Sequence, residues 1–190
     1  MKNWITVVSA GVLAAFAAPT VADHDHNGRQ RIFRTKLVSY NEVTSVSSPA
    51  FGTFYAIVNK EGTGFTYWLS YWDLQFPVSQ AHIHFGQHHQ NGGISVWLCE
   101  GTSLAPDNAG DVPSCQGPRS HSVTGSIVAS EVIGPAGQGI APGEFAELLA
   151  AMRAGAAYAN VHSFLAGDPT ATPPIPNGGF PGGEIRGQIE

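Results

Sequence analysis

Short runs rich in β-branched and aromatic residues recur along the chain from Arg31 onward, separated by clusters of Gly, Pro, Asn and Ser. Several of these runs alternate apolar and polar positions, which is typical of strands that bury one face. A glycine-containing turn at residues 61–64 joins two runs and indicates a hairpin. The pattern predicts eight strands, at residues 32–40, 51–59, 64–72, 79–85, 94–99, 122–129, 157–161 and 184–189.

One segment follows a helical period instead. Phe145, Leu148, Leu149 and Met152 are spaced i, i+3, i+4 and i+7, and Gly155 follows where a helix would end. Residues 133–143 and 164–183 are rich in Gly and Pro and are predicted to be surface loops. We therefore expect an all-β fold, a Greek-key-like β-sandwich with one short helix and long Gly/Pro-rich loops.

The beginning of the chain has the features of a signal peptide, predicted to cover residues 1–22. Lys2 precedes an apolar run, and small residues lead up to Ala22. The run is shorter than the ~20 residues that span a bilayer, and an uncleaved membrane anchor is the alternative. Residues 23–30 are predicted to be a flexible polar N-terminus and residues 31–190 a single domain without a membrane span. These features predict a periplasmic or secreted protein.

Charge and cysteine content narrow the classes of function. The formal net charge is −5, and the few Lys and Arg residues are scattered, so nucleic acid is not an expected partner. Cys99 and Cys115 flank a turn-rich loop, which predicts a disulfide formed in an oxidising compartment. The alternative is a pair of thiolate metal ligands, although the close C-x-x-C spacing of structural zinc sites is absent.

The candidate chemistry lies in the histidines. His82 and His84 alternate with Ala81, Ile83 and Phe85 along a predicted strand, so both imidazoles point to one face. Two imidazoles on a stiff strand form half of a site for copper, zinc, nickel or iron.

A third imidazole comes from another predicted strand, where Tyr158, Asn160 and His162 share one face. If that strand lies beside residues 79–85, His162 completes a three-nitrogen site. The alternative is a hydrogen-bonded polar patch without metal. His88 and His89, in the loop after the first pair, are candidate additional ligands.

Further polar residues are candidates for supporting roles. Asn160 shares its predicted face with His162. Glu184 and Arg186 alternate on another predicted strand, which could place both side chains near the histidines. The alternative is a structural role, either as an ion pair or through a hydrogen bond to a loop carbonyl, and we favour this alternative. The tail histidine His24 could bind copper or nickel if cleavage exposed a suitably placed terminal amine, although a solvated tail without function is the expected reading.

Five segments in order resemble the CHRD domain, which is named after chordin and occurs in bacterial secreted proteins: residues 41–43, 81–86, 91–93, 158–162 and 182–189. The resemblance covers about residues 31–190 and does not include the His88-His89 pair. In chordin, such domains belong to a protein that binds an extracellular growth factor. The His-x-His pair and the later Asn-Val-His also resemble, over a shorter stretch, the arrangement of the copper ligands in Cu/Zn superoxide dismutase. The zinc ligands of that enzyme have no clear counterpart here.

These observations lead to two hypotheses. The first is an exported metal-binding protein, with copper favoured and zinc as the alternative cofactor, that buffers metal or acts as a superoxide dismutase-like oxidoreductase. The second is a metal-free adhesion or protein-interaction module with an extracellular protein partner.

Overall fold

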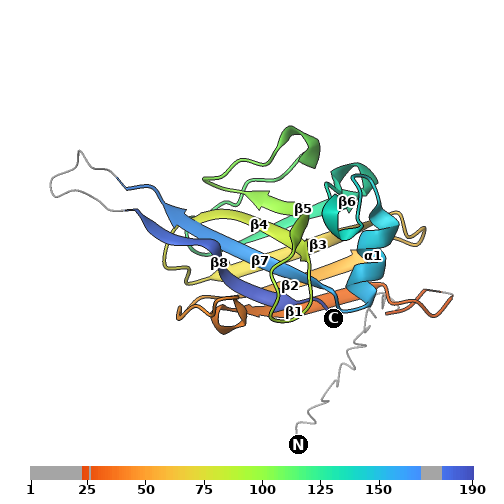
Figure 1. Ribbon diagram of the computed structural model, residues 1–190, viewed down its shortest axis with the longest axis horizontal. Coiled ribbons are helices and arrows are strands. Elements are labelled where there is room, and N and C mark those ends of the chain that lie inside the picture. The colour runs from red at the N-terminus through yellow and green to blue at the C-terminus, as the bar shows by residue number, and fades with distance from the viewer. Residues whose placement is uncertain (1–22, 26, 168–176) are drawn as a thin grey trace, which may run out of the picture.

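The computed structural model describes residues 23–25, 27–167 and 177–190 (Figure 1). The predicted signal peptide lies outside the described residues. Within them, no helix has the length and apolar character needed to cross a membrane. The eight strands are β1 (Ile32–Val38), β2 (Phe51–Val58), β3 (Gly64–Trp72), β4 (Val78–Phe85), β5 (Gly93–Glu100), β6 (His121–Val128), β7 (Ala157–Leu165) and β8 (Gly178–Gln188).

All eight strands belong to one antiparallel sheet in the order β5-β4-β7-β8-β1-β2-β3-β6. The sheet curls until its two end strands, β5 and β6, approach each other, which gives a nearly closed, sandwich-like barrel (Figure 1). The predicted all-β class with a single short helix is confirmed.

Alternating apolar side chains of the strands fill the inside of the barrel. Phe33, Phe54, Leu69, Ile83 and Val161 are among the core residues with almost no exposed surface. Helix α1 (Phe145–Arg153) packs against the core, where Phe145 meets Phe65, and buries the apolar side that its spacing predicted. Short 3-10 helices lie at Ser39–Asn41, Asp107–Ala109, Ala129–Glu131 and Ala136–Gln138.

The hairpin of β7 and β8 is longer than predicted. Residues Ser163 to Leu165 pair with residues Phe180 to Gly178, so both ends of the predicted 164–183 loop belong to strands. The register shifts between Val161 and Ser163, opposite Pro181. A proline without a backbone donor is tolerated at such an irregularity, which explains why a Gly/Pro-rich segment can still be a strand.

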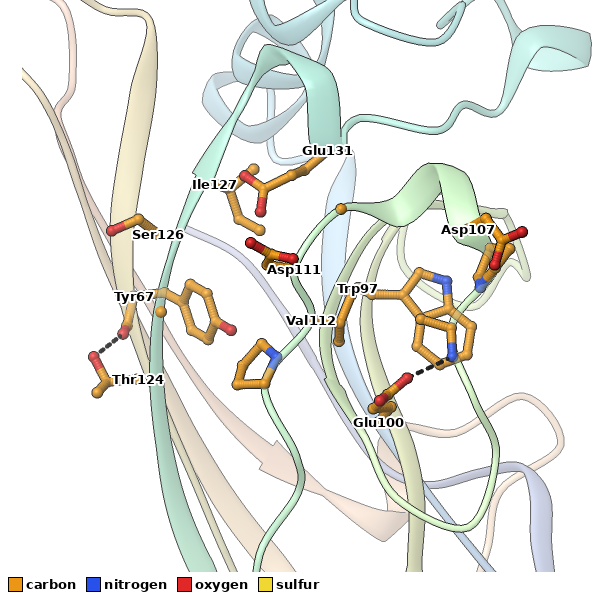
Figure 2. A pocket seen from close by; sticks show the side chains of 15 residues that line it. Tyr67, Trp97, Glu100, Asp107, Asp111, Val112, Thr124, Ser126, Ile127 and Glu131 are labelled. Atoms are coloured by element: carbon orange, nitrogen blue, oxygen red, sulfur yellow. Dashed lines mark hydrogen bonds between the residues drawn. The ribbon is translucent and has the colours of Figure 1, made fainter.

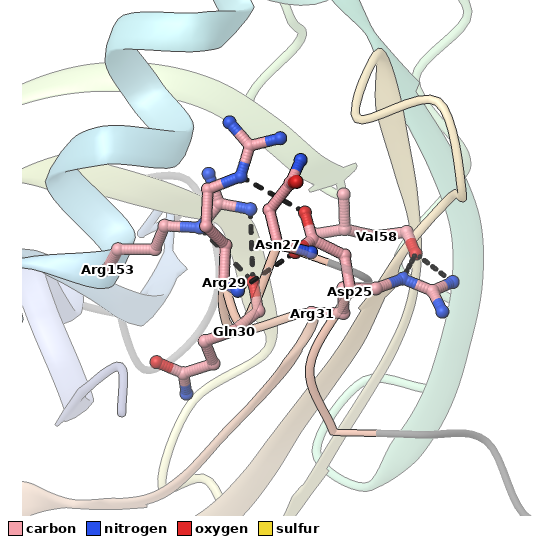
Figure 3. A network of polar contacts seen from close by, with 7 residues as sticks. All are labelled: Asp25, Asn27, Arg29, Gln30, Arg31, Val58 and Arg153. Carbon is pink, nitrogen blue, oxygen red and sulfur yellow. Dashed lines mark hydrogen bonds and ion pairs between the residues drawn. The ribbon is translucent and has the colours of Figure 1, made fainter.

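A hydrogen-bonded turn organises the described part of residues 23–30, as Figure 3 shows. The Asp25 carboxylate accepts the backbone N–H groups of Asn27 and Arg29 and the Arg29 side chain. Arg153, at the end of α1, donates to the Gln30 carbonyl. Polar composition alone did not indicate this turn, because it is set by side-chain bonds of Asp25 rather than by a periodic pattern.

Cys99 and Cys115 form the predicted disulfide. It joins β5 to the end of the loop that leads toward β6, and both sulfur-bearing side chains are buried. A closed loop of this size contributes roughly 3 kcal/mol to stability, mainly by restricting the unfolded chain.

Candidate metal centre

Three histidines from two neighbouring strands form the only group of three or more potential metal ligands with converging ligand atoms among the described residues. Strand β4 pairs with β7 so that Gln80 lies opposite His162 and His82 opposite Asn160. This pairing brings His82, His84 and His162 to the same face, with one ring nitrogen from each within 4.8 Å of the others. The expectation that the two strands lie side by side is confirmed.

Strands β4 and β7 pair regularly from Gln80 to Phe85, and the irregularities lie in their outer partner strands, β5 and β8. On β5, the strand beside β4, the register shifts next to both His82 and His84. Between β7 and β8 the register shifts at His162. Such bulges bend a strand and redirect a side chain. Here the bulged strands are the ones that bring Trp97 and the Pro181 carbonyl to the histidines.

Backbone carbonyl groups determine the tautomer of two rings. His84 Nδ1 lies 2.9 Å from the Gly92 carbonyl oxygen, and His162 Nδ1 lies 2.9 Å from that of Pro181. Because a carbonyl oxygen only accepts, both Nδ1 atoms carry the proton and both Nε2 atoms keep a lone pair. A carbonyl that holds the second ring nitrogen in this way orients a metal-binding histidine.

The remaining imidazole nitrogens have few partners. His82 Nδ1 lies 3.3 Å from His162 Nε2, while His82 Nε2 and His84 Nε2 are buried without any hydrogen-bond partner. A buried polar atom left unpaired costs about 1–3 kcal/mol. Two such atoms in one cluster of imidazoles are a feature that a bound metal ion would explain.

Burial keeps the three rings neutral. His82 is fully buried and the other two expose less than a tenth of their surface. Desolvation lowers the pKa of His84 and of His162 to about 4, and desolvation together with the two neighbouring rings lowers the pKa of His82 further. Neutral imidazole is the form that binds metal, so at neutral pH no proton has to leave.

Aromatic side chains line two sides of the cluster. The Trp97 ring meets the His82 ring edge-on, with centroids 4.2 Å apart. Tyr158 stacks on His84, with centroids 4.8 Å apart and planes within 3°. The Arg186 guanidinium covers the other side of Tyr158, with Cζ 3.3 Å from the ring centroid. Three layers therefore lie in the order His84, Tyr158, Arg186, and Tyr158 separates the guanidinium from the imidazole.

Asn160 links the histidine face to a loop from the other end of the sequence. Its Nδ2 donates to Glu42 Oε1 at 2.8 Å, and its Oδ1 has no partner. Burial raises the pKa of Glu42 to about 7, although the Arg186 charge and the Asn160 bond oppose the rise. Glu42 was not predicted as a site residue because it lies on a loop, where no periodic pattern indicates its neighbours.

Glu184 and Arg186 do not pair with each other. The Glu184 carboxylate accepts Ser48 Oγ, the Gln75 backbone N–H and Ser163 Oγ. Arg186 donates to the Gln87 carbonyl and forms no ion pair within the part of the chain that the structure describes. Of the roles considered from the sequence, the bond to a loop carbonyl is the one observed for Arg186.

His88 and His89 remain exposed in the loop after β4, and the group of converging ligand atoms contains neither of them. Their rings lie 6.1 Å apart. The His24 side chain is also exposed, on the N-terminal turn. The structure thus assembles the three strand histidines and leaves the loop and tail histidines apart.

A pocket of about 640 Å³ lies between the two end strands of the sheet, and Trp97 lines it (Figure 2). Four carboxylates surround it, from Glu100, Asp107, Asp111 and Glu131. Two of these groups cap backbone N–H groups: Glu100 accepts Ala105 N–H, and Glu131 accepts Val128 N–H. Those bonds give at least part of this acidic group a structural role in holding the loops.

Comparison with protein families identifies the domain. Residues 33–165 match the family model described as the CHRD domain. The chain belongs to the CHRD domain family. The matched range contains all three clustered histidines and stops before β8, although β8 pairs with β7 and β1 and completes the CHRD barrel of this chain. Comparisons with curated proteins and with solved structures gave no match.

Proposed function

We propose that this CHRD protein is exported and binds one copper ion through His82, His84 and His162. The observation that carries the proposal is the pair of carbonyl bonds that fix both Nδ1–H groups and leave both Nε2 atoms with a lone pair within a buried cluster of three imidazoles. In a polar patch without metal, the buried imidazole nitrogens would be expected to have hydrogen-bond partners, whereas His82 Nε2 and His84 Nε2 have none.

Copper is favoured over zinc by the charge of the donor set. All three donors are neutral imidazoles, and burial is nearly complete. The desolvation cost of an ion rises steeply with its charge, so a buried neutral cluster suits monovalent copper better than a divalent ion. Imidazole is a suitable ligand for copper as well as for zinc, and zinc is therefore the competitor to test.

The enclosure of the site favours metal storage or buffering over superoxide chemistry. An enzyme of that kind needs an open coordination position that its small substrate can reach. The histidines are covered by their neighbours, with His82 exposing no surface at all. Export is supported by the signal-peptide pattern of residues 1–22 and agrees with the disulfide, which is typical of oxidising compartments.

Metal content tests the proposal. The purified protein is loaded with copper(I) under a reductant too weak to open the disulfide, or with zinc, and then desalted. We expect about one copper per chain and less zinc. The double variant His84→Gln/His162→Gln should lose the metal, and circular dichroism would verify that it is folded.

Two matched controls separate the strand site from other histidines. The exposed pair His88→Ala/His89→Ala and the tail pair His24→Ala/His26→Ala each remove two imidazoles and should leave the copper content unchanged. Copper that disappears with either control pair and persists in the strand variant would contradict the proposal, as would a wild-type protein that retains no metal.

A further inference from the structure

The outer side of strands β1, β2 and β3, here called the aromatic face, exposes side chains that the barrel core does not use. In the pairing of β2 with β3, Phe51 lies opposite Trp72 and Tyr55 opposite Trp68. Phe51 and Trp72 stack with ring centroids 5.1 Å apart, and Tyr55 and Trp68 lie 5.7 Å apart. Phe51 and Trp68 nevertheless expose 45% and 44% of their surface. Exposed aromatic clusters of this kind mark binding sites.

The two pairs repeat along the strands. Trp68 and Trp72 are four residues apart on β3, a distance of roughly 14 Å at about 3.4 Å per residue. Thr53 and Ser70 lie opposite each other between the pairs, and Ser70 Oγ is 2.7 Å from Ser122 Oγ on β6. A row of aromatic pairs separated by hydroxyl groups suits a polymer that offers C–H surfaces and hydroxyl groups in alternation.

Positive charge borders the same face. Arg34 lies opposite Tyr55 and Lys36 opposite Thr53, and both cations are exposed. Neither forms an ion pair within the described residues. They line a pocket of about 560 Å³ together with Tyr55 and His88; Glu190 also lines it but is not paired with either cation. In a chain with a net charge of −5, a binding face with unpaired cations is complementary to an anionic ligand.

We propose that the aromatic face binds an acidic polysaccharide, with sugar rings on the two aromatic pairs and uronate carboxylates at Arg34 and Lys36. A lipid surface fits less well, because the hydroxyl side chains of Thr53 and Ser70 separate the two aromatic pairs and interrupt the apolar surface. The binding does not depend on the histidine cluster, since strands β4 and β7 lie elsewhere in the sheet.

Native gels with and without dissolved polygalacturonate test this binding, with xylan as the neutral polymer. The wild-type protein should migrate more slowly in the gel with polygalacturonate than in the polymer-free gel. Xylan should slow its migration less than polygalacturonate does. Trp68→Ala and Phe51→Ala should each weaken the binding about tenfold or more. Arg34→Gln/Lys36→Gln should remove the preference for the acidic polymer and the sensitivity of binding to salt.

Two matched controls lie outside the aromatic face: Leu104→Ala removes an exposed apolar side chain, and Lys60→Gln removes an exposed cation. Both should bind as wild type does, and Trp68→Ala should keep its metal content. Equal retardation of wild type and Trp68→Ala would overturn the proposal. So would binding to phosphatidylglycerol vesicles without binding to the polymer, or self-association that Trp68→Ala abolishes.

Discussion

At the scale of single residues, Gly183 lies at the contact between the histidine face and the loop that carries Glu42. Its φ of +126° lies in the region that favours glycine, and an added Cβ would lie 2.6 Å from Glu42 Oε1 and 2.7 Å from Asn160 Nδ2. These two atoms form the hydrogen bond that connects the loop to β7. A side chain at this position would therefore act on the backbone and on the buried bond together.

We predict that Gly183→Ala lowers the free energy of unfolding by about 1–3 kcal/mol, from backbone strain and the displaced carboxylate. Urea denaturation followed by circular dichroism would measure the change. Gly182→Ala is a matched control on the same strand, because an added Cβ there meets nothing within 4 Å and the backbone is not in the left-handed region. A Gly183→Ala protein as stable as Gly182→Ala would show that the Glu42–Asn160 bond is dispensable.

At the scale of elements, the strand period accounts for what the sequence predicted about the site. The alternation in residues 81–85 places His82 and His84 together, and the same argument places His162 beside Asn160 on its own strand. The pairing of β4 with β7 could only be assumed, because it joins residues about 80 positions apart. Pro181 and Trp97 were not predicted as neighbours of the histidines, since bulges and register shifts set their positions.

The disulfide of strand β5 leads to a prediction about the same element. Replacing both cysteines by Cys99→Ser/Cys115→Ser should lower the free energy of unfolding by about 3 kcal/mol, because the unfolded chain regains the freedom of the closed loop. Urea denaturation without reductant would measure the loss. Copper content should stay near one per chain, because the three histidines lie on β4 and β7. A double variant as stable as wild type would mean that the loop is restricted without the bond.

At the scale of the whole molecule, one continuous sheet carries two separate surfaces. The histidines occupy β4 and β7, while the aromatic face occupies β1 to β3, and β8 lies between the two regions in the strand order. The carbonyls of Gly92 and Pro181 lie against the histidines, whereas Phe51 and Trp68 on the aromatic face are exposed. The barrel core can therefore stay constant while each surface is changed independently, which is why variants of one surface serve as controls for the other.

The pH dependence of stability is also a property of the whole molecule. In the metal-free protein, His84 and His162 have a pKa of about 4, whereas unfolded histidine has 6.5. Between these values the unfolded chain binds protons that the folded chain does not, so stability falls as pH decreases from 6.5 to 4. Glu42 acts in the opposite direction, because its pKa rises from 4.5 to about 7 and its contribution is lost as pH increases through that range.

We therefore predict that the free energy of unfolding decreases from pH 6 to pH 4.5. Each buried histidine contributes a slope of roughly 1.4 kcal/mol per pH unit, and the opposing effect of Glu42 reduces the total slope. Urea denaturation at several pH values would measure the slope. Glu42→Gln keeps an oxygen for Asn160 but cannot ionise, so its slope should be steeper than that of wild type. His88→Ala/His89→Ala removes two exposed imidazoles and should leave the slope unchanged. A slope that is flat in wild type and in Glu42→Gln would mean that the buried histidines take up protons without unfolding, and that the cluster is more open to water than its burial indicates.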